Sequence, residues 1–354
     1  QLVAAGTPFA CAKREIPRIQ RGIVIPERTI TRGILVEVKD VKKVAIFGAG
    51  TMGPGLAQVF STAGYDVTMY SRKAETLDKA VSVAKSNLAT FVEHGLIAES
   101  AVHEVLARIK TTQSVEEAAT DADFVIESIA EKLDAKQALY EELDRVCPAR
   151  TIFTSNTSYL NIYEVMPAAR LPQTVIAHWF APPHIVPLVE VVKGPETAQA
   201  TVDFVVELLK KVDRVPTVLE KFVPGFCINR FLRIIGRECF FLLDNGYMTA
   251  EQLDLAVKAS IIPRAMVLGF IQRYDFTGID LSYGNLQNKA FIEAPIDNQP
   301  KSLVELMDKG ELGVKSGKGF FDYSDRPLEQ VLRERDAALI KVFEDVKDLI
   351  YKRI

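Results

Sequence analysis

The sequence predicts an α/β fold, with a doubly wound parallel sheet followed by a mostly α-helical C-terminal domain. Three observations predict it. Short apolar runs alternate with amphipathic stretches between residues 42 and about 220, the first run is followed by a glycine-rich turn, and strand-like runs fade after about residue 222. Strands that alternate with helices form βαβ units, whose strands are parallel and whose crossovers are right-handed.

The first elements follow one another closely. Val44–Phe47 is a short apolar run bounded by glycine, which suits a buried parallel strand. Thr51–Ala63 has helical spacing and ends at Gly64, a residue that commonly terminates helices. The same reasoning predicts further strands at Asp66–Tyr70, Ala122–Ile126, Thr151–Thr154, Thr174–Ala177 and Pro187–Val191, and helices at Ala74–His94 and Ala135–Val146.

Helical patterns dominate the rest of the chain. Phe226–Asn245 is apolar with helical periodicity, and Thr249 with Gln252 three residues later is typical of a capping box. Pro327–Ile354 predicts a final charged amphipathic helix. We therefore place a domain boundary near Pro224–Gly225, between a doubly wound domain (41–223) and a mostly helical domain (224–354).

Residues 1–40 form a basic N-terminal extension or arm, in which Gly22–Val38 is expected to make one or two strands or an extended segment. They contain no apolar core like that of a signal peptide. The chain begins at Gln1, which suggests a processed or truncated form. A structural arm is favoured over an organelle address.

The composition excludes several classes of protein. Apolar residues make up 48% and charged residues 25%, as in ordinary globular proteins, and a net charge of −3 gives no reason to expect nucleic acid or an anionic membrane as a partner. No apolar run approaches the ~18 residues of a membrane span. The four cysteines are widely spaced and the histidines number four, so we expect no metal site and no disulfide framework. Free thiols fit a reducing compartment and a cytoplasmic location, or an organelle matrix if residues 1–40 are a leader.

Gly48-Ala49-Gly50-Thr51-Met52-Gly53 has the spacing G-x-G-x-x-G between a predicted strand and a predicted helix. That context indicates a Rossmann-type dinucleotide site. Gly48 permits the tight turn, Gly50 lets a pyrophosphate approach the backbone, and Gly53 lets the helix pack closely on the sheet. Thr51 and Met52 begin the helix, whose N-terminus favours phosphate. The alternative is a tight turn that binds no ligand.

The residues after the second strand bear on the cofactor. NAD-binding domains usually carry an acid there for the ribose hydroxyls, whereas this chain has Ser71-Arg72-Lys73. A serine and two cations would bind a 2′-phosphate, so NADP(H) is favoured. If Arg72 stacks on the adenine and Lys73 is only solvated, NAD(H) remains possible.

His178 and Glu190 flank a proline-rich turn between two predicted strands, which could bring them side by side. Histidine exchanges protons near neutral pH, and a carboxylate on its second ring nitrogen would fix the tautomer. The alternative is a histidine at a strand end and a glutamate on a solvated edge.

Glu127, Glu131 and Lys136 follow a predicted strand at the carboxyl edge of the sheet, where a nicotinamide ribose would lie. Solvated surface charge is the alternative, and we favour it for Glu127.

Six motifs in register carry a resemblance. They are the glycine loop, I-E-S-I-A-E-K-L-D-A-K, S-N-T-S, H-W-F-A-P-P with Glu190, P-G-F-C-I-N-R and G-V-K-S-G-K-G-F-F-D-Y. Over residues 42–324 the chain resembles the 3-hydroxyacyl-CoA dehydrogenase family. The resemblance implies an NAD(P)-dependent oxidoreductase of fatty acid metabolism that interconverts a 3-hydroxyacyl thioester and its 3-keto form.

The resemblance also implies the roles of catalytic residues. His178 would be the general base, or the acid in reduction, and Glu190 would pair with its imidazole. Ser158 would hydrogen-bond the reacting oxygen, and Asn229 would orient substrate and His178 from the helical domain.

Glu131, Lys136 and Lys315 match positions that contact the cofactor in the family. Homodimerisation through the helical domain is also implied. Phe240, Phe241 and Leu242 are candidates for the dimer seam, with ordinary core packing as the favoured alternative.

The chain departs from the family at three places. Ala181 replaces an asparagine next to the nicotinamide, Ser71 replaces an acid, and Ile261–Gly278 lacks the usual G-P pair. His184 is expected on the surface of the turn and Cys227 at a helix start, and neither is given a role.

Other functions stay open. Lys85 is the only lysine or arginine between residues 84 and 96, where the family contacts CoA, so the substrate could instead be a small non-CoA 3-hydroxy acid or a thioester on an acyl carrier protein. A non-catalytic nucleotide-binding or structural relative is the alternative of a different class.

Overall fold

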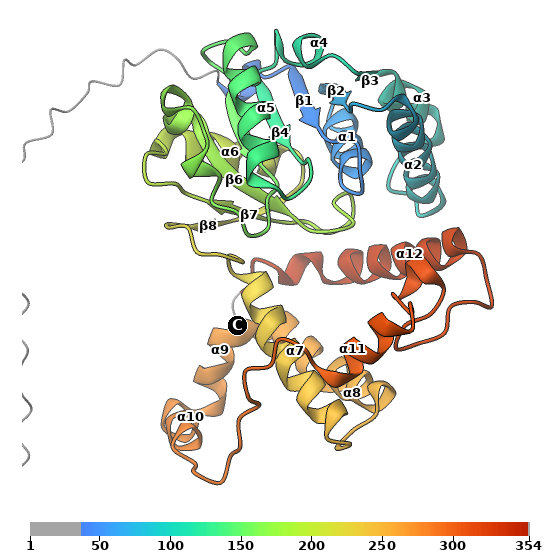
Figure 1. The fold of residues 1–354 in the computed structure, drawn as a ribbon, viewed down its shortest axis with the longest axis vertical. Helices are drawn as coiled ribbons and strands as arrows, with labels where there is room; N and C mark the ends of the chain where they lie inside the picture. Colours follow the sequence, from blue (N-terminus) through green and yellow to red (C-terminus); the bar gives the residue numbers. More distant parts are fainter. Residues whose placement is uncertain (1–36, 353–354) are drawn as a thin grey trace, which may run out of the picture. The chain divides into compact units, whose positions relative to one another are not determined.

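The computed structural model describes residues 37–352 of the chain. Eight strands form one sheet in the order β3-β2-β1-β4-β5-β6-β7-β8 (Figure 1). The strands are β1 (Lys43–Phe47), β2 (Asp66–Tyr70), β3 (Ile109–Thr112), β4 (Phe124–Glu127), β5 (Ile152–Ser155), β6 (Thr174–Trp179), β7 (Leu188–Val192) and β8 (Val215–Leu219). The strand order reverses at β1, which lies between β2 and β4. In doubly wound sheets ligands bind at the carboxyl ends of the strands beside such a reversal.

Helices cover both faces of the sheet because β1 alternates its side chains between two apolar clusters. Val44 and Ile46 pack with residues of α1 (Gly53–Thr62), α2 (Ala74–Glu93) and α6 (Gln199–Lys211). Ala45 and Phe47 pack on the other face with α4 (Val115–Ala119) and α5 (Leu133–Val146). Strands buried on both faces are expected for a parallel sheet between helical layers, so the doubly wound prediction is confirmed.

The last two strands depart from the predicted parallel sheet. β7 pairs antiparallel with β6, and β8 pairs parallel with β7. The connection from β6 to β7 spans only residues 180–187. A parallel crossover needs a dozen or more residues, so this short connection can only return the chain as a hairpin.

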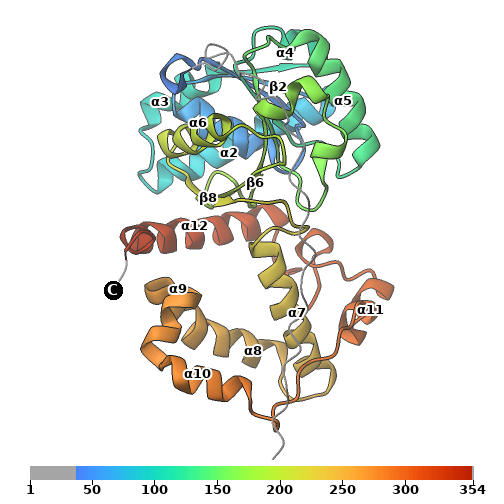
Figure 2. The same ribbon diagram turned by 90° about the vertical axis from the view of Figure 1, so that its left-hand side faces the viewer.

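Beyond β8 the described chain is helical (Figure 2). The helices are α7 (Ile228–Asp244), α8 (Ala250–Ala256), α9 (Ile262–Thr277), α10 (Ile279–Leu286), α11 (Lys301–Asp308) and α12 (Leu328–Val346). The side chain of Thr249 accepts a hydrogen bond from the Gln252 amide at the start of α8, as the capping motif predicted. Gly269, at φ 66°, interrupts α9 within the segment that lacks the family's G-P pair.

The remaining short elements are α3 (Glu99–Ala107), the π-helix η4 (Val257–Ile261) and the 3-10 helices η1 (Val38–Asp40), η2 (Ile162–Glu164), η3 (Ala168–Gln173), η5 (Val314–Ser316) and η6 (Lys347–Leu349). The strands or arm expected over Gly22–Val38 lie outside the described residues, apart from the last two positions. Between residues 37 and 352, no helix has both the length and the hydropathy to cross a membrane.

Candidate active site

The glycine turn joins β1 to α1 at the strand-order reversal. Gly48 has φ 124°, and a Cβ there would lie 2.2 Å from the backbone oxygen of Ser128. A Cβ on Gly53 would lie 2.3 Å from the Gly48 oxygen, whereas one on Gly50 would meet no atom within 4 Å. The first and third glycines are therefore required by packing, and the space beside Gly50 is open for a ligand.

This turn fits a dinucleotide. Gly50 and Thr51 are exposed and Met52 is the N-cap of α1, yet no side chain caps the first amides of that helix. Uncapped amides and the positive end of the helix suit a pyrophosphate. Gly48, Gly50 and Gly53 shape this cradle, and Thr51 and Met52 border it.

Directly after β2 come Ser71, Arg72 and Lys73, the residues predicted to bind a 2′-phosphate on the cofactor ribose. The Ser71 amide donates to the Thr112 oxygen (3.2 Å), and the Arg72 oxygen accepts from Gln113 (2.9 Å). Lys73 is the N-cap residue of α2. The side chains of Arg72 and Lys73 are exposed and form no ion pair among the described residues, so both cations are available to a ligand.

The hairpin brings three of the four predicted catalytic residues together. His178 lies directly opposite Glu190 in the β6–β7 register, and its Nδ1 is 2.8 Å from Glu190 Oε2. The Ser158 hydroxyl, in the loop after β5, lies 3.2 Å from His178 Nε2. Glu190 is 1% exposed and His178 4%, which excludes the alternative of a solvated strand edge. A carboxylate that accepts from Nδ1–H leaves Nε2 as the proton acceptor.

Two aromatic rings that the sequence analysis did not identify contact the imidazole of His178. Phe180 and Phe226 contact the imidazole edge to face, with ring centroids 4.6 and 5.3 Å away. Phe226 is 1% exposed and lies in the positive-φ region at 49°. Its position after the P-G pair was the only signal available in the sequence. The rings restrict the imidazole to the orientation that Ser158 and Glu190 require.

The second oxygen of Glu190 contacts the helical region. Glu190 Oε1 accepts from the amides of Cys227 and Ile228, each at 2.9 Å, at the N-terminus of α7. Asn229 is the next residue and half-buried, and the structure gives it no hydrogen bond to His178. Cys227 is the N-cap of α7, as expected from its place before the helix.

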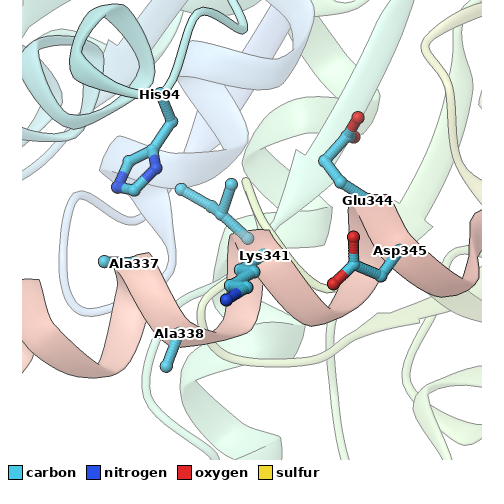
Figure 3. A pocket seen from close by; sticks show the side chains of 7 residues that line it. His94, Ala337, Ala338, Lys341, Glu344 and Asp345 are labelled. Carbon is cyan, nitrogen blue, oxygen red and sulfur yellow. The ribbon is translucent and has the colours of Figure 1, made fainter.

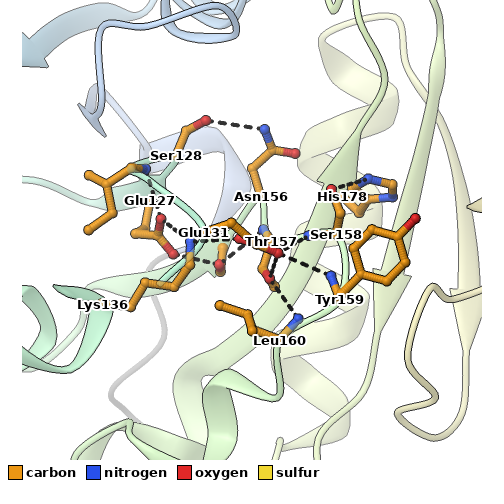
Figure 4. A network of polar contacts seen from close by, with 12 residues as sticks. Glu127, Ser128, Glu131, Lys136, Asn156, Thr157, Ser158, Tyr159, Leu160 and His178 are labelled. Carbon is orange, nitrogen blue, oxygen red and sulfur yellow. Dashed lines mark hydrogen bonds and ion pairs between the residues drawn. The ribbon is translucent and has the colours of Figure 1, made fainter. Parts of the chain in front are cut away.

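A polar network extends from β4 and α5 to the loop after β5 that carries Ser158 (the serine loop, residues 156–160) (Figure 4). Glu131 accepts from the hydroxyl of Thr157 (2.6 Å) and from the amides of Ser158 (2.8 Å) and Tyr159 (3.1 Å). Burial would raise the pKa of Glu131, but these bonds and the charge of Lys136 outweigh it and lower the pKa.

Glu127 is not on the surface, and our expectation for it was wrong. It is fully buried, and its carboxylate accepts from Lys136 Nζ (2.6 Å), Tyr140 (2.7 Å) and Ser155 (2.6 Å). Lys136 is itself 1% exposed and lies 3.4 Å from Glu131. The cofactor roles of Glu131 and Lys136 remain predictions, and the geometry shows that both also belong to this network.

Two further expectations have different outcomes. His184 is buried rather than on the turn surface, because Gly55 of α1 leaves room for its ring: a Cβ at Gly55 would lie 2.9 Å from His184 Nδ1. Lys315 is exposed in η5 and makes no hydrogen bond or ion pair within residues 37–352, so its cofactor role remains a prediction.

One pocket lies apart from the site, between His94 at the end of α2 and the helix α12 (Figure 3). Ile340, Lys341 and Glu344 line it, and none of the predicted site residues does. We assign it no part in the chemistry.

Comparison with known proteins identifies the family. The sequence model of the "3-hydroxyacyl-CoA dehydrogenase, NAD binding domain" matches residues 43–222, and that of the "3-hydroxyacyl-CoA dehydrogenase, C-terminal domain" matches residues 225–323. A probable 3-hydroxybutyryl-CoA dehydrogenase of Bacillus subtilis is 34% identical over 81% of this chain and 99% of its own length.

Relatives that are not named for CoA substrates also match. A 5-formyl-3-hydroxy-2-methylpyridine 4-carboxylate 5-dehydrogenase of Mesorhizobium japonicum is 30% identical over 85% of this chain and 97% of its own. A crystal structure of a dehydrogenase of that name, described as NAD⁺ dependent, superposes with a TM-score of 0.78 at 28% identity, covering 87% of this chain and 99% of that one. With both domain models matched in order, the chain belongs to the 3-hydroxyacyl-CoA dehydrogenase family of oxidoreductases.

Proposed function

We propose that this protein interconverts a 3-hydroxyacyl thioester and its 3-keto form, with His178 as the group that moves the proton. The observation that carries the proposal is the triad in which the buried pair His178 and Glu190 meets the half-buried Ser158. Glu190 contacts Nδ1 of the imidazole, and the Ser158 hydroxyl contacts Nε2. The site lies at the carboxyl edge of the sheet, as does the glycine turn.

In the oxidative direction the substrate hydroxyl takes a position beside Ser158 and gives its proton to His178 Nε2. Glu190 stabilises the imidazolium that forms and keeps Nδ1 protonated. Ser158 donates to the substrate oxygen as it becomes a carbonyl. A nicotinamide cofactor held at the glycine turn would supply the hydride acceptor for C3, while the proton from the substrate oxygen goes to His178. In reduction the same groups act in reverse.

His178→Gln tests the proposal. We expect kcat for acetoacetyl-CoA reduction to fall by about 10²–10⁴-fold, because general acid–base catalysis contributes that much. NADH binding, followed by fluorescence titration, should be unchanged. His103→Gln on the exposed face of α3 is the matched control and should keep full activity. Near-normal turnover by His178→Gln would exclude His178 as the proton carrier, and a wild-type protein that oxidises no NAD(P)H would favour a non-catalytic relative.

A small 3-hydroxy acid without CoA is the second candidate. It is supported by the TM-score of 0.78 to a pyridine-carboxylate dehydrogenase and by the scarcity of cations on α2, where Lys85 is alone between residues 84 and 96. Steady-state kinetics with acetoacetate against acetoacetyl-CoA separate the two candidates. A higher kcat/KM for acetoacetate would assign the protein to the small acids.

For the cofactor, we propose a preference for NADP(H) within this NAD-binding family. Ser71, Arg72 and Lys73 put no carboxylate where a 2′-phosphate would lie, and both cations are exposed. Ser71→Asp with Arg72→Ile should shift the ratio of kcat/KM for NADPH over NADH towards NADH. An unchanged ratio would refute the proposal.

We further propose that the protein forms a homodimer through its helical domain. No residue of α7, α8, α9, α10 or α11 is fully buried in the isolated chain. Ile271 is 81% exposed, Leu286 80% and Ile296 82%, and such a dense apolar surface is covered in stable proteins. Phe240 and Phe241 are less suited to the seam, because their rings already contact Phe320 and Tyr247.

Light scattering after gel filtration tests this assembly. Ile271→Asp should convert a dimer into monomers, because a charge cannot be buried unpaired in an apolar interface. Val83→Asp on α2, also at an exposed apolar residue, should leave the dimer intact. A monomeric wild type would refute the proposal.

A further inference from the structure

Glu127 occupies a position that its charge makes costly. Its carboxylate is fully buried at the end of β4 and accepts four hydrogen bonds, including one from the Ile129 amide (2.9 Å). A buried ion pair with Lys136 is seldom more stabilising than apolar residues of the same size. Stability alone therefore does not explain why this ion pair is present.

The network from Glu127 continues without a break to the catalytic base. Lys136 contacts Glu127 at 2.6 Å and Glu131 at 3.4 Å. Glu131 in turn holds the amide of Ser158, whose hydroxyl contacts His178 (Figure 4). Each link joins groups within hydrogen-bonding or ion-pair distance.

The charges favour this arrangement. Burial and the charge of Glu127 raise the pKa of Tyr140 well above its usual value, so its phenol remains a proton donor to Glu127. Ser155, opposite Glu127 in the β4–β5 register, donates to the same oxygen. With its carboxylate fixed from both sides, Glu127 holds Lys136 in one position.

We propose that Glu127 and Lys136 are positioning residues for the reaction. Through Glu131 they set the backbone of the serine loop and thereby the distance from the Ser158 hydroxyl to the reacting oxygen. The expected fall in kcat rests on the proposed function. The expected change in the position of the serine loop does not depend on it.

Hydrogen exchange measures that position without turnover. Glu131 Oε1 accepts from the amides of Ser158 and Tyr159. Hydrogen exchange in peptides that cover residues 157–160 therefore reports whether these two hydrogen bonds are intact. In the full-length protein with NADH bound, Lys136→Met should speed exchange in this segment. The same result is expected for Glu127→Gln, which nearly preserves the shape and guards against a lysine variant that fails to fold.

The kinetic arm uses the same variants. We expect kcat to fall about 10- to 100-fold in both variants, the effect of displacing a reacting group by ~1 Å. The NADH dissociation constant should be unchanged in Glu127→Gln, because Glu127 is fully buried. Asp144→Asn is the matched control, since it breaks the ion pair between Asp144 of the same helix α5 and the buried Arg170 (2.7 Å), outside the network. It should alter neither exchange at 157–160 nor kcat.

Two results would overturn the inference. Unchanged exchange at residues 157–160 in both network variants would show that the loop does not depend on Glu127. Weaker NADH binding with normal exchange and normal kcat at saturating NADH would assign Lys136 to cofactor contact alone. A wild-type protein inactive on every thioester would refute the proposed function, while the exchange result would still decide the positional claim.

Discussion

His184 should make the stability of the protein depend on pH below neutrality. Its ring is 7% exposed and lies against Phe91, with ring centroids 5.7 Å apart. Nδ1 has no hydrogen-bond partner among the described residues. Burial, with the charges of Arg214 and Arg335, lowers the pKa of His184 from 6.5 to about 4. The folded protein therefore keeps this imidazole neutral where the unfolded chain protonates it.

The sign and the size follow from linkage. Between pH 6.5 and pH 4 the unfolded state binds one more proton at this residue, so the free energy of unfolding falls as pH falls. The contribution is fully present above pH 6.5. Its loss by pH 4 amounts to about 3 kcal/mol, and about 2 kcal/mol of that is lost by pH 5. Domains are stable by only ~5–15 kcal/mol, so the loss is a large fraction.

The assay is urea unfolding of the wild type and His184→Leu at pH 7.5 and pH 5, at one protein concentration. The difference between the two proteins isolates His184, because every other titratable group is common to both. We expect the variant to lose about 2 kcal/mol less than the wild type over this interval. The control is His103→Leu, at an exposed residue of α3. Equal losses in the wild type and His184→Leu would refute the reasoning.

Two further predictions concern the glycine turn and the ring beside the base. Gly50→Ala should leave the unfolding temperature unchanged but weaken NADH binding, since its Cβ meets no protein atom and enters the cradle; Gly48→Ala, whose Cβ would meet the Ser128 oxygen, should lower both. Equal thermal stability of the two variants, measured by calorimetry, would contradict this geometry. Phe226→Ala should lower the free energy of unfolding by about 3–5 kcal/mol, the usual range for a buried phenylalanine, and should lower kcat because His178 loses a ring contact. An unchanged kcat in folded Phe226→Ala would show that the ring does not orient the base.

The sequence predicted what depends on local pattern. The strand Asp66–Tyr70 was placed with its observed bounds. The predicted turn between two strands left open whether His178 and Glu190 meet, and the register of β6 and β7 shows that they do. The alternation of strands and helices predicted the parallel pairing correctly as far as β6. It did not predict the antiparallel direction of β7, because that direction depends on the length of the connection and not on the apolar pattern.

Burial of charged groups could not be predicted in this way. Glu127 resembles any acid after a strand, and its burial depends on Lys136, Tyr140 and Ser155, which come from another helix and the next strand. His184 follows a proline-rich turn that is typical of surfaces, and only the missing side chain of Gly55 lets it pack inward. Both expectations failed because burial is decided by side chains on other elements of the fold, which the local pattern of a segment does not contain.

The two oxygens of the Glu190 carboxylate serve different parts of the structure. One oxygen orients the base and the other is held by the amides that begin α7. If α7 were to withdraw, that second oxygen would be left buried without a donor, and the carboxylate would have to turn to recover one. The imidazole would then lose its fixed tautomer at the same moment. The orientation of the base at His178 therefore depends on the contact between Glu190 and the first amides of α7, so a displacement of this helix would also disturb the imidazole.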